Sequence, residues 1–355
     1  MRTNQGYLLL LILVPLLSCK QPAIPEYVAD PVDSFIVDIL ERPADFRHVY
    51  AEGDSGLSGF CANDQVLVQY RRVGQRMICS AREYIEAPGL LLCSWKDEQG
   101  KWTFIDEHCC MWHYDKLRRL TSSGCLFDRP ADNISLGASS AMPVVFYKGD
   151  TILSFIKYGK RIDESVRSGN ALLRIGSKGV SPFFQRTGSL KQAIQVEQMY
   201  CLNGSKLVML YAGIDTVYTM DLSSGVCQQI AIANPHYTPQ KPADPDIITD
   251  VGKRASYYAS NFTYCGIFFN PRTGNYALLY NEPEKSEDML PSGDGKITGV
   301  IILDASFHKI ANYRFRRPAW IGLAFTTAAG LVIPVDPQKH NGNAYHDLPC
   351  YVYHF

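Results

Sequence analysis

A strand-and-turn rhythm repeats along this chain, and it restricts the possible folds more than any other feature of the sequence. Within Asn203–Ile232, apolar runs predict strands over Lys206–Tyr211, Thr216–Asp221 and Val226–Ile232. Turns that contain glycine or paired serines separate these runs, as tight hairpins require. Strands joined in this way form an antiparallel meander, the unit from which a propeller blade is built.

Segments of the same form occur before and after this one. They are Asp64–Arg72, Leu90–Asp106, Asp150–Lys160 with Asn170–Gly188, Gly274–Pro283 with Ile297–Phe315, and Gly330–Pro337 with the C-terminal residues. The later units begin about 55 to 70 residues apart, a spacing in the range of radial repeat arrays. The sequence therefore predicts an all-β fold, a β-propeller of about six blades made of antiparallel meanders.

The N-terminal part of the chain is expected to close this ring. A propeller avoids free sheet edges by joining its last blade to its first. The apolar residues of Phe35–Ile39 predict a strand that precedes the first meander. We expect this strand to complete the last blade, Gly330–Phe355, and so to hold the two ends of the propeller together.

The extreme N-terminus has the features of an export signal. Met1–Gly6 is polar with one positive side chain. The apolar run Tyr7–Leu17 is too short to cross a bilayer, which takes about 20 apolar residues. Its end, Leu16-Leu17-Ser18-Cys19, resembles the bacterial lipobox, in which the cysteine is acylated and the chain is cut before it. The resemblance implies lipid attachment at Cys19; the alternative is an ordinary secretory signal with a chance cysteine.

These features predict a signal peptide over residues 1–18, a tether over 19–34 and a single propeller domain over 35–355. Lys20 directly after the lipobox cysteine favours the outer membrane, on its periplasmic or its surface face. The 35 basic and 35 acidic residues give a formal net charge of zero. This balance gives no electrostatic reason to expect nucleic acid as a partner, and the membrane would be contacted through the N-terminal lipid only.

Most of the ten cysteines that follow Cys19 lie inside apolar strand-like runs, as Cys79 and Cys93 do. In such runs a cysteine acts as a small hydrophobe, so we expect most of the ten to be buried and unpaired. A disulfide framework is the alternative in an exported chain. The run His108–His113 holds residue types that bind zinc, but their spacing matches no paired ligand pattern and no metal site is predicted.

Recognisable catalytic motifs are absent from the sequence. It contains no HExxH, no GxSxG, no P-loop and no CxxC. We therefore predict no catalytic residue and no cofactor. Carboxylates brought together from distant blades would leave no local motif. A hydrolase or lyase that acts on glycans or peptides consequently remains the alternative to a non-catalytic protein.

Aromatic and basic residues lie together in Arg254–Tyr264. Tyr257 and Tyr264 would stack on a sugar or a peptide, and Arg254 would pair with an anion. The alternative is an ordinary blade strand that carries surface tyrosines. Two polar insertions, Ala233–Asp250 and Asn281–Lys296, are predicted to be exposed loops and are further candidates for ligand contact.

The C-terminal half carries a family resemblance. The stretches GVIILDASFHKIANYRF, GLAFTTAAGLVIPV and CYVYHF, together with the lipobox, resemble uncharacterised lipoproteins of Bacteroidota that have a TolB-like six-bladed β-propeller. The similarity is clearest from Ala193 to Phe355. It implies a fold and a place in the cell envelope, and it implies no catalytic residues.

Together, these features favour a membrane-anchored lipoprotein whose propeller is a non-catalytic binding or scaffold domain. The expected partner is a glycan, a peptide or another protein of the cell envelope. A rigid ring that presents many connections at one mouth is suited to holding such a ligand.

Overall fold

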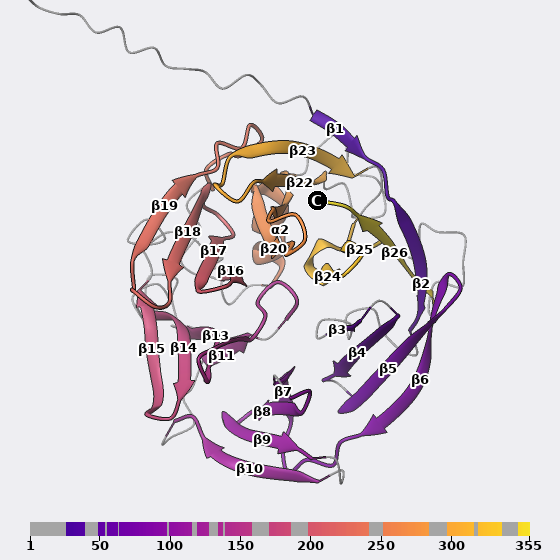
Figure 1. The fold of residues 1–355 in the computed structure, drawn as a ribbon, viewed down its shortest axis with the longest axis vertical. Coiled ribbons are helices and arrows are strands. Elements are labelled where there is room, and N and C mark those ends of the chain that lie inside the picture. Colours follow the sequence, from indigo (N-terminus) through magenta and orange to yellow (C-terminus); the bar gives the residue numbers. More distant parts are fainter. Residues whose placement is uncertain are drawn as a thin grey trace, which may run out of the picture.

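The computed structural model describes residues 26–39, 49–53, 55–62, 64–97, 99–115, 119–127, 134–137, 139–157, 170–185, 198–240, 251–283, 297–315, 319–335 and 347–355. In this part of the chain, short strands form sheets that surround a common centre (Figure 1). Each sheet is built around an antiparallel meander whose first strand lies nearest the centre and whose last strand lies near the rim. This arrangement is a β-propeller, so the predicted all-β class and propeller fold are confirmed.

The described strands form six consecutive meanders. The first contains β3 (Val49–Glu52), β4 (Gly56–Cys61), β5 (Val66–Val73) and β6 (Arg76–Tyr84), and the second contains β7 (Leu91–Lys96), β8 (Trp102–Asp106), β9 (Cys110–Tyr114) and β10 (Leu120–Cys125). The third contains β11 (Ile134–Gly137), β12 (Val145–Tyr147), β13 (Asp150–Lys157), β14 (Asn170–Gly176) and β15 (Gly179–Gln185). The fourth contains β16 (Gln198–Asn203), β17 (Lys206–Tyr211), β18 (Thr216–Asp221) and β19 (Cys227–Ala231). The fifth contains β20 (Thr263–Phe269), β21 (Tyr276–Asn281), β22 (Thr298–Leu303) and β23 (Lys309–Phe315), and the sixth contains β24 (Phe325–Thr327), β25 (Gly330–Pro334) and β26 (Asp347–Tyr353).

Two N-terminal strands bind the ends of the ring together. β2 (Asp33–Asp38) runs antiparallel to β26 and places Phe35 opposite Cys350. It also forms a short parallel bridge to β6 of the first meander, so that the first and sixth meanders share one sheet. β1 (Glu26–Ala29) adds a parallel strand to β23 on the rim (Figure 1). The predicted closure by a strand near Phe35–Ile39 is therefore confirmed.

The hydrophobic core lies between neighbouring sheets. All residues of Leu207–Tyr211 in β17 are buried, because other meanders cover both faces of the fourth one. Leu210 packs in one cluster with Leu278 of the fifth meander, and Met209 packs in another with Ile152 of the third. A strand that is buried on both faces appears in the sequence as a continuous apolar run. Burial of each large apolar side chain contributes about 1.5–3 kcal/mol.

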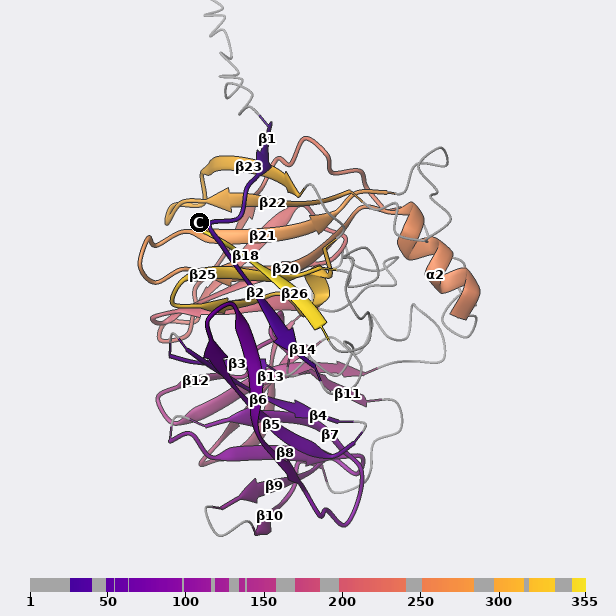
Figure 2. The same ribbon diagram turned by 90° about the vertical axis from the view of Figure 1, so that its right-hand side faces the viewer.

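The two ends of the ring differ in their connections. Since the strands of a meander alternate in direction, successive connections fall at opposite ends. One end, which we call the turn end, carries the two-residue hairpins 74–75, 148–149, 177–178 and 204–205. The other end, which we call the connection end, carries the links from the rim strand of one meander to the central strand of the next. Figure 2 shows the helix α2 (Val251–Ser260) projecting at the connection end.

The helix α2 corrects one part of the sequence interpretation. Residues 254–260 are helical, so the alternative of an ordinary blade strand is wrong for them, and β20 begins only at Thr263. The helix lies in the link between β19 on the rim and β20 near the centre, and its ten residues, about 15 Å long, project away from the ring. The Asn261 side chain donates a hydrogen bond to the Tyr257 carbonyl at 2.7 Å, which satisfies one carbonyl group at the helix end.

The cysteines follow the expectation in part. Eight of the ten after Cys19 form no disulfide, as expected. Only four of the eight are fully buried, because the others lie at half-covered or outer strand positions; the buried ones are Cys93, Cys109, Cys201 and Cys350. The remaining two, Cys110 and Cys125, form a disulfide, so the expectation of free thiols is wrong for this pair.

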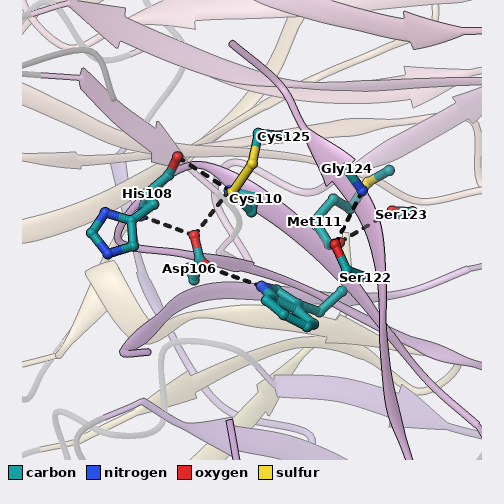
Figure 3. Close-up of a disulfide and its surroundings, with 9 residues drawn as sticks. Asp106, His108, Cys110, Met111, Ser122, Ser123, Gly124 and Cys125 are labelled. Atoms are coloured by element: carbon teal, nitrogen blue, oxygen red, sulfur yellow. Dashed lines mark hydrogen bonds between the residues drawn. A yellow bond between two sulfur atoms is a disulfide. The ribbon is translucent and has the colours of Figure 1, made fainter. Parts of the chain in front are cut away.

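The disulfide joins β10 to β9 at directly opposed positions (Figure 3). The buried carboxylate of Asp106 organises the turn before β9, since it accepts hydrogen bonds from the backbone nitrogens of His108 and Cys110, both at 2.9 Å. It also accepts one from Trp112 Nε1 at 2.8 Å. Cys109 lies between these donors with a positive φ of 59°, is buried and takes no part in the disulfide.

The N-terminal predictions fall on residues outside those described. The signal peptide and Cys19 belong to this part of the chain, so lipid attachment remains a prediction. Within the described residues, no helix has the length and apolar character needed to cross a bilayer.

Candidate binding site between the fourth and fifth meanders

Buried polar side chains gather where the fourth and fifth meanders meet. They are Asn234, Asn261, Thr263, Glu282, Thr298 and Asn312. A buried polar group costs free energy unless it is hydrogen-bonded, so such a concentration indicates a specific arrangement. We use the name junction site for the residues at its centre, Asp215, Asn234, His236, Tyr264, Glu282 and Arg314.

One half of the junction site is the carboxylate of Asp215, which is hydrogen-bonded to the phenol of Tyr264. Asp215 lies in the turn between β17 and β18, and its Oδ1 accepts a hydrogen bond from the Tyr264 hydroxyl at 2.5 Å. Its Oδ2 accepts one from the Asn234 backbone nitrogen at 3.1 Å. Burial raises the pKa of Asp215 above its ordinary value, although the hydrogen bonds from Tyr264 and Asn234 act in the opposite direction. These bonds fix the chain as it leaves β19 against the start of β20.

The other half is the ion pair between Arg314 and Glu282, with His236 in contact with Arg314. The Arg314 guanidinium donates to Glu282 Oε1 from Nε at 2.9 Å and contacts the same oxygen from Nη2 at 2.7 Å. Arg314 Nη2 also lies 3.1 Å from His236 Nδ1. Because arginine can only donate, His236 Nδ1 accepts this bond and the neutral ring carries its proton on Nε2. The His236 Nδ1 atom lies 3.6 Å from Glu282 Oε1.

The aromatic ring of Tyr280 packs against His236. The His236 ring stacks on Tyr280, with ring centroids 6.0 Å apart and planes inclined by 19°. The Tyr280 hydroxyl donates to Asn312 Oδ1 at 3.0 Å in the buried interior of the fifth meander. A side chain at Gly299 would place its Cβ 2.4 Å from the Tyr280 ring, so only glycine leaves room for this tyrosine.

The accessibility of these groups decides what the junction site can do. His236 Nε2 is covered, so its proton cannot reach a ligand in this conformation. The Glu282 side chain is 10% exposed, whereas that of Arg314 is 32% exposed. The group presented to solvent is therefore a cation held in place by a buried carboxylate and a histidine. Such a group suits the binding of an acidic ligand rather than a proton transfer.

The three residues predicted to contact a ligand lie close to this site, in different roles. Arg254 belongs to α2, and its side chain is not among those described. Tyr257 is 8% exposed and its hydroxyl donates to Gln240 Oε1 at 3.4 Å, which joins α2 to the segment after β19. Tyr264 is 1% exposed and bonded to Asp215, so neither tyrosine ring is presented for stacking.

Sequence reasoning missed Asp215, His236, Glu282 and Arg314. These residues come from a turn, an inter-sheet segment and the ends of two strands, so no local spacing connects them. For two of the four, the sequence offered one signal: His236 and Glu282 lie near the start of the two polar insertions that were predicted as candidate loops. The described parts of these insertions are 233–240 and 281–283.

Buried phenols, of which Tyr264 belongs to the junction site, make the stability of the fold depend on pH in alkaline solution. Burial raises the pKa of Tyr264 well above its usual value, with Asp215 adding to the effect, and it raises those of Tyr50 and Tyr200. Below about pH 10 these groups hold their protons in both states. Above it the unfolded chain releases them while the folded chain keeps them, so stability falls as the pH rises.

We therefore expect the phenolate absorbance of these tyrosines to appear only as circular dichroism reports unfolding. Tyr264→Phe should reduce the alkaline loss of stability, whereas Tyr84→Phe, at a 64% exposed tyrosine, should leave it unchanged. Full titration of all tyrosines before unfolding would contradict the burial described here.

Comparison with known proteins shows which solved structures have a similar fold. No protein-family model matches the chain, and no curated protein matches it in sequence. A solved structure of a DUF4221 family member from Bacteroides vulgatus ATCC 8482 is similar over 92% of this chain and 97% of its own, with a TM-score of 0.72 and 14% identity. A candidate exported protein from Bacteroides fragilis NCTC 9343 covers 93% and 98%, with a TM-score of 0.55 and 10% identity.

A third neighbour is more distant. Virginiamycin B lyase from Staphylococcus aureus matches 85% of this chain and 82% of its own, with a TM-score of 0.44 and 11% identity. At that level the similarity carries no argument about activity. The comparisons thus show that this chain shares its fold with the two Bacteroides structures, and they leave the role of the junction site to its own chemistry.

Proposed function

We propose that this chain is an exported, lipid-anchored protein of the cell envelope whose propeller binds an acidic glycan, peptide or partner protein without turnover. The observation that carries the proposal is the accessible Arg314, held by buried Glu282 and by His236 at the junction of two sheets. Preorganised hydrogen-bond donors reduce the entropy lost when a ligand binds. Long inter-sheet connections at the same end would supply further contacts.

The anchor rests on Cys19 and can be tested separately from binding. Several acyl chains, each contributing about 0.8 kcal/mol per buried CH₂, give a lasting attachment. Replacement of Cys19 with alanine should move the protein from the membrane pellet to the soluble fraction and remove the lipid mass. A variant that remains in the pellet like wild type would show that the anchor lies elsewhere.

The binding function is tested with the mature chain from which the lipid-bearing Cys19 is also omitted, residues 20–355, on arrays of acidic and neutral glycans and peptides. Arg314→Gln should weaken every specific interaction by at least about tenfold, since a hydrogen bond to a charged group contributes about 1.5–3 kcal/mol. Lys178→Gln, at an exposed residue of the turn end, is the matched control and should bind like wild type. Thermal unfolding of both variants separates lost binding from lost folding.

The hydrolase or lyase alternative is examined in the same experiment. Each array member is scored for cleavage as well as retention. Reproducible turnover that is abolished by Glu282→Gln would replace the binding proposal with an enzymatic one. Retention that is equal for wild type and Arg314→Gln would show that the ligand binds away from the junction site.

A further inference from the structure

The rim strand β19 differs from the other outer strands of the ring. Among the described sheets, the outer edges of β6, β23 and β26 are covered by β1 or β2. The strands β10, β15 and β19 are the outermost strands of their sheets, and no other described strand pairs with their outer edges (Figure 1). An uncovered edge offers a row of backbone donors and acceptors to another chain, and proteins usually guard it.

Two of these three edges have a feature that hinders pairing with another strand. In β10 the pairing with β9 shifts between Ser122 and Gly124, so a bulge bends this strand out of register. In β15, Pro182 lacks a backbone donor and Phe184 has a φ of 67°. The strand β19 contains neither proline nor charge, and its five pairs with β18 run without a shift.

The hydrogen bonds that flank β19 show which of its residues face outward. Asp221 nitrogen donates to the Val226 carbonyl at 3.0 Å, and Ile232 nitrogen donates to the Asp215 carbonyl at 3.2 Å. In an antiparallel pair, hydrogen-bonded positions alternate with open ones. Val226, Gln228, Ile230 and Ile232 therefore bond inward to β18. The backbone groups of Cys227, Gln229 and Ala231 point away from the sheet.

We propose that β19 is a self-association edge, at which two copies of this chain pair antiparallel about a two-fold axis through Gln229. In this register Gln229 lies opposite its own copy, and Cys227 lies opposite Ala231 of the other copy. The backbone N–H and C=O groups of Cys227, Gln229 and Ala231 are then all hydrogen-bonded to the second copy. No other register of β19 with itself satisfies all of them.

The surroundings of β19 favour a second copy over another partner. The edge carries no charge, and the chain has a formal net charge of zero, so copies approach without electrostatic repulsion. Val226, which is 58% exposed, lies opposite residue 232 of the second copy in this register and would be covered there. Within one copy, an added strand already covers an outer edge of the ring, since β1 pairs in parallel with β23.

A variant pair at one position tests the backbone role. Gln229→Pro removes the central outward donor without touching the bonds to β18, and Gln229→Thr keeps it. Light scattering of the mature chain at micromolar concentrations should give a dimer for wild type and Gln229→Thr, and a monomer for Gln229→Pro. A monomeric wild type, or a dimeric Gln229→Pro variant, overturns the proposal.

Cross-linking tests the register and does not depend on the proline variant folding. Residues 227 and 231 are too far apart along one strand to form a disulfide with each other. In the dimer, Ala231→Cys places a new thiol opposite the native Cys227 of the other copy. Glutathione disulfide, which is reduced to two glutathione molecules, should therefore convert this variant to a covalent dimer.

The double variant Ala231→Cys/Cys227→Ser should remain monomeric on a denaturing, non-reducing gel. Failure of Ala231→Cys to cross-link, or equal cross-linking of the double variant, contradicts the register. Because none of these readouts involves a ligand, a negative result here leaves the binding proposal untouched, and the reverse also holds.

Discussion

Val37→Asp should prevent the ring from closing. Val37 lies at the middle of β2, is 0% exposed and packs with residues of the first and sixth meanders. A carboxylate placed there has no partner, and an uncompensated buried charge costs several kcal/mol in addition to the lost apolar contacts. Since folded proteins are stable by only about 5–15 kcal/mol, we expect loss of cooperative unfolding or a large drop in the midpoint.

Val32→Asp provides the matched control for this prediction. Val32 precedes β2 and is 52% exposed, while its backbone nitrogen donates to the Val352 carbonyl in either variant. The same change of side chain should therefore alter stability by less than about 0.5 kcal/mol. Chemical denaturation of both variants measures the difference. Equal stability of Val37→Asp and wild type would show that β2 does not close the ring.

Loss of the disulfide should produce the second large effect. Cys110 and Cys125 are separated by 15 residues, and a bridge across a loop of this length stabilises a protein by about 3 kcal/mol. The bridge ties β10, whose residues after Leu120 are exposed, to a better covered neighbour. The double variant Cys110→Ser/Cys125→Ser should therefore unfold at lower denaturant concentration and lose sensitivity to reductant.

The exposed thiol Cys227 provides the control, since Cys227→Ser should leave stability unchanged and keep the sensitivity to reductant. Alkylation under denaturing, non-reducing conditions should modify eight of the ten cysteines after Cys19 and leave the bridged pair unmodified. Ten modified thiols would contradict the pairing.

The parts of the fold that could be predicted are those in which local sequence determines local structure. Leu207–Tyr211 is apolar throughout because it is covered on both faces, and the adjacent turns have residues that favour hairpins. Closure through Phe35 followed from the need to avoid free edges. By contrast, β16 was not predicted, because polar groups such as Gln198 and Asn203 interrupt its apolar run; they bond to Ser154 and Tyr276 in other meanders.

The candidate site could not be predicted for a related reason. Glu282 and Arg314 are 32 residues apart, and His236 is 78 residues from Arg314, so only the ring brings them together. The helix α2 could not be predicted either, because its ten residues lie in a link between two meanders and outside the strand pattern. The disulfide joins Cys110 and Cys125, which lie in separate segments of the sequence, and only the strand pairing shows that they are opposed.

We infer that the propeller binds its ligand at the connection end through the junction site. Hydrogen–deuterium exchange of the mature chain, with and without the acidic array member that it retains best, measures this directly. We expect ligand-dependent protection in 212–215, 232–240 and at residues 282–283, and no change in the hairpins 148–149 and 177–178 of the turn end. Protection confined to the turn-end hairpins would contradict it.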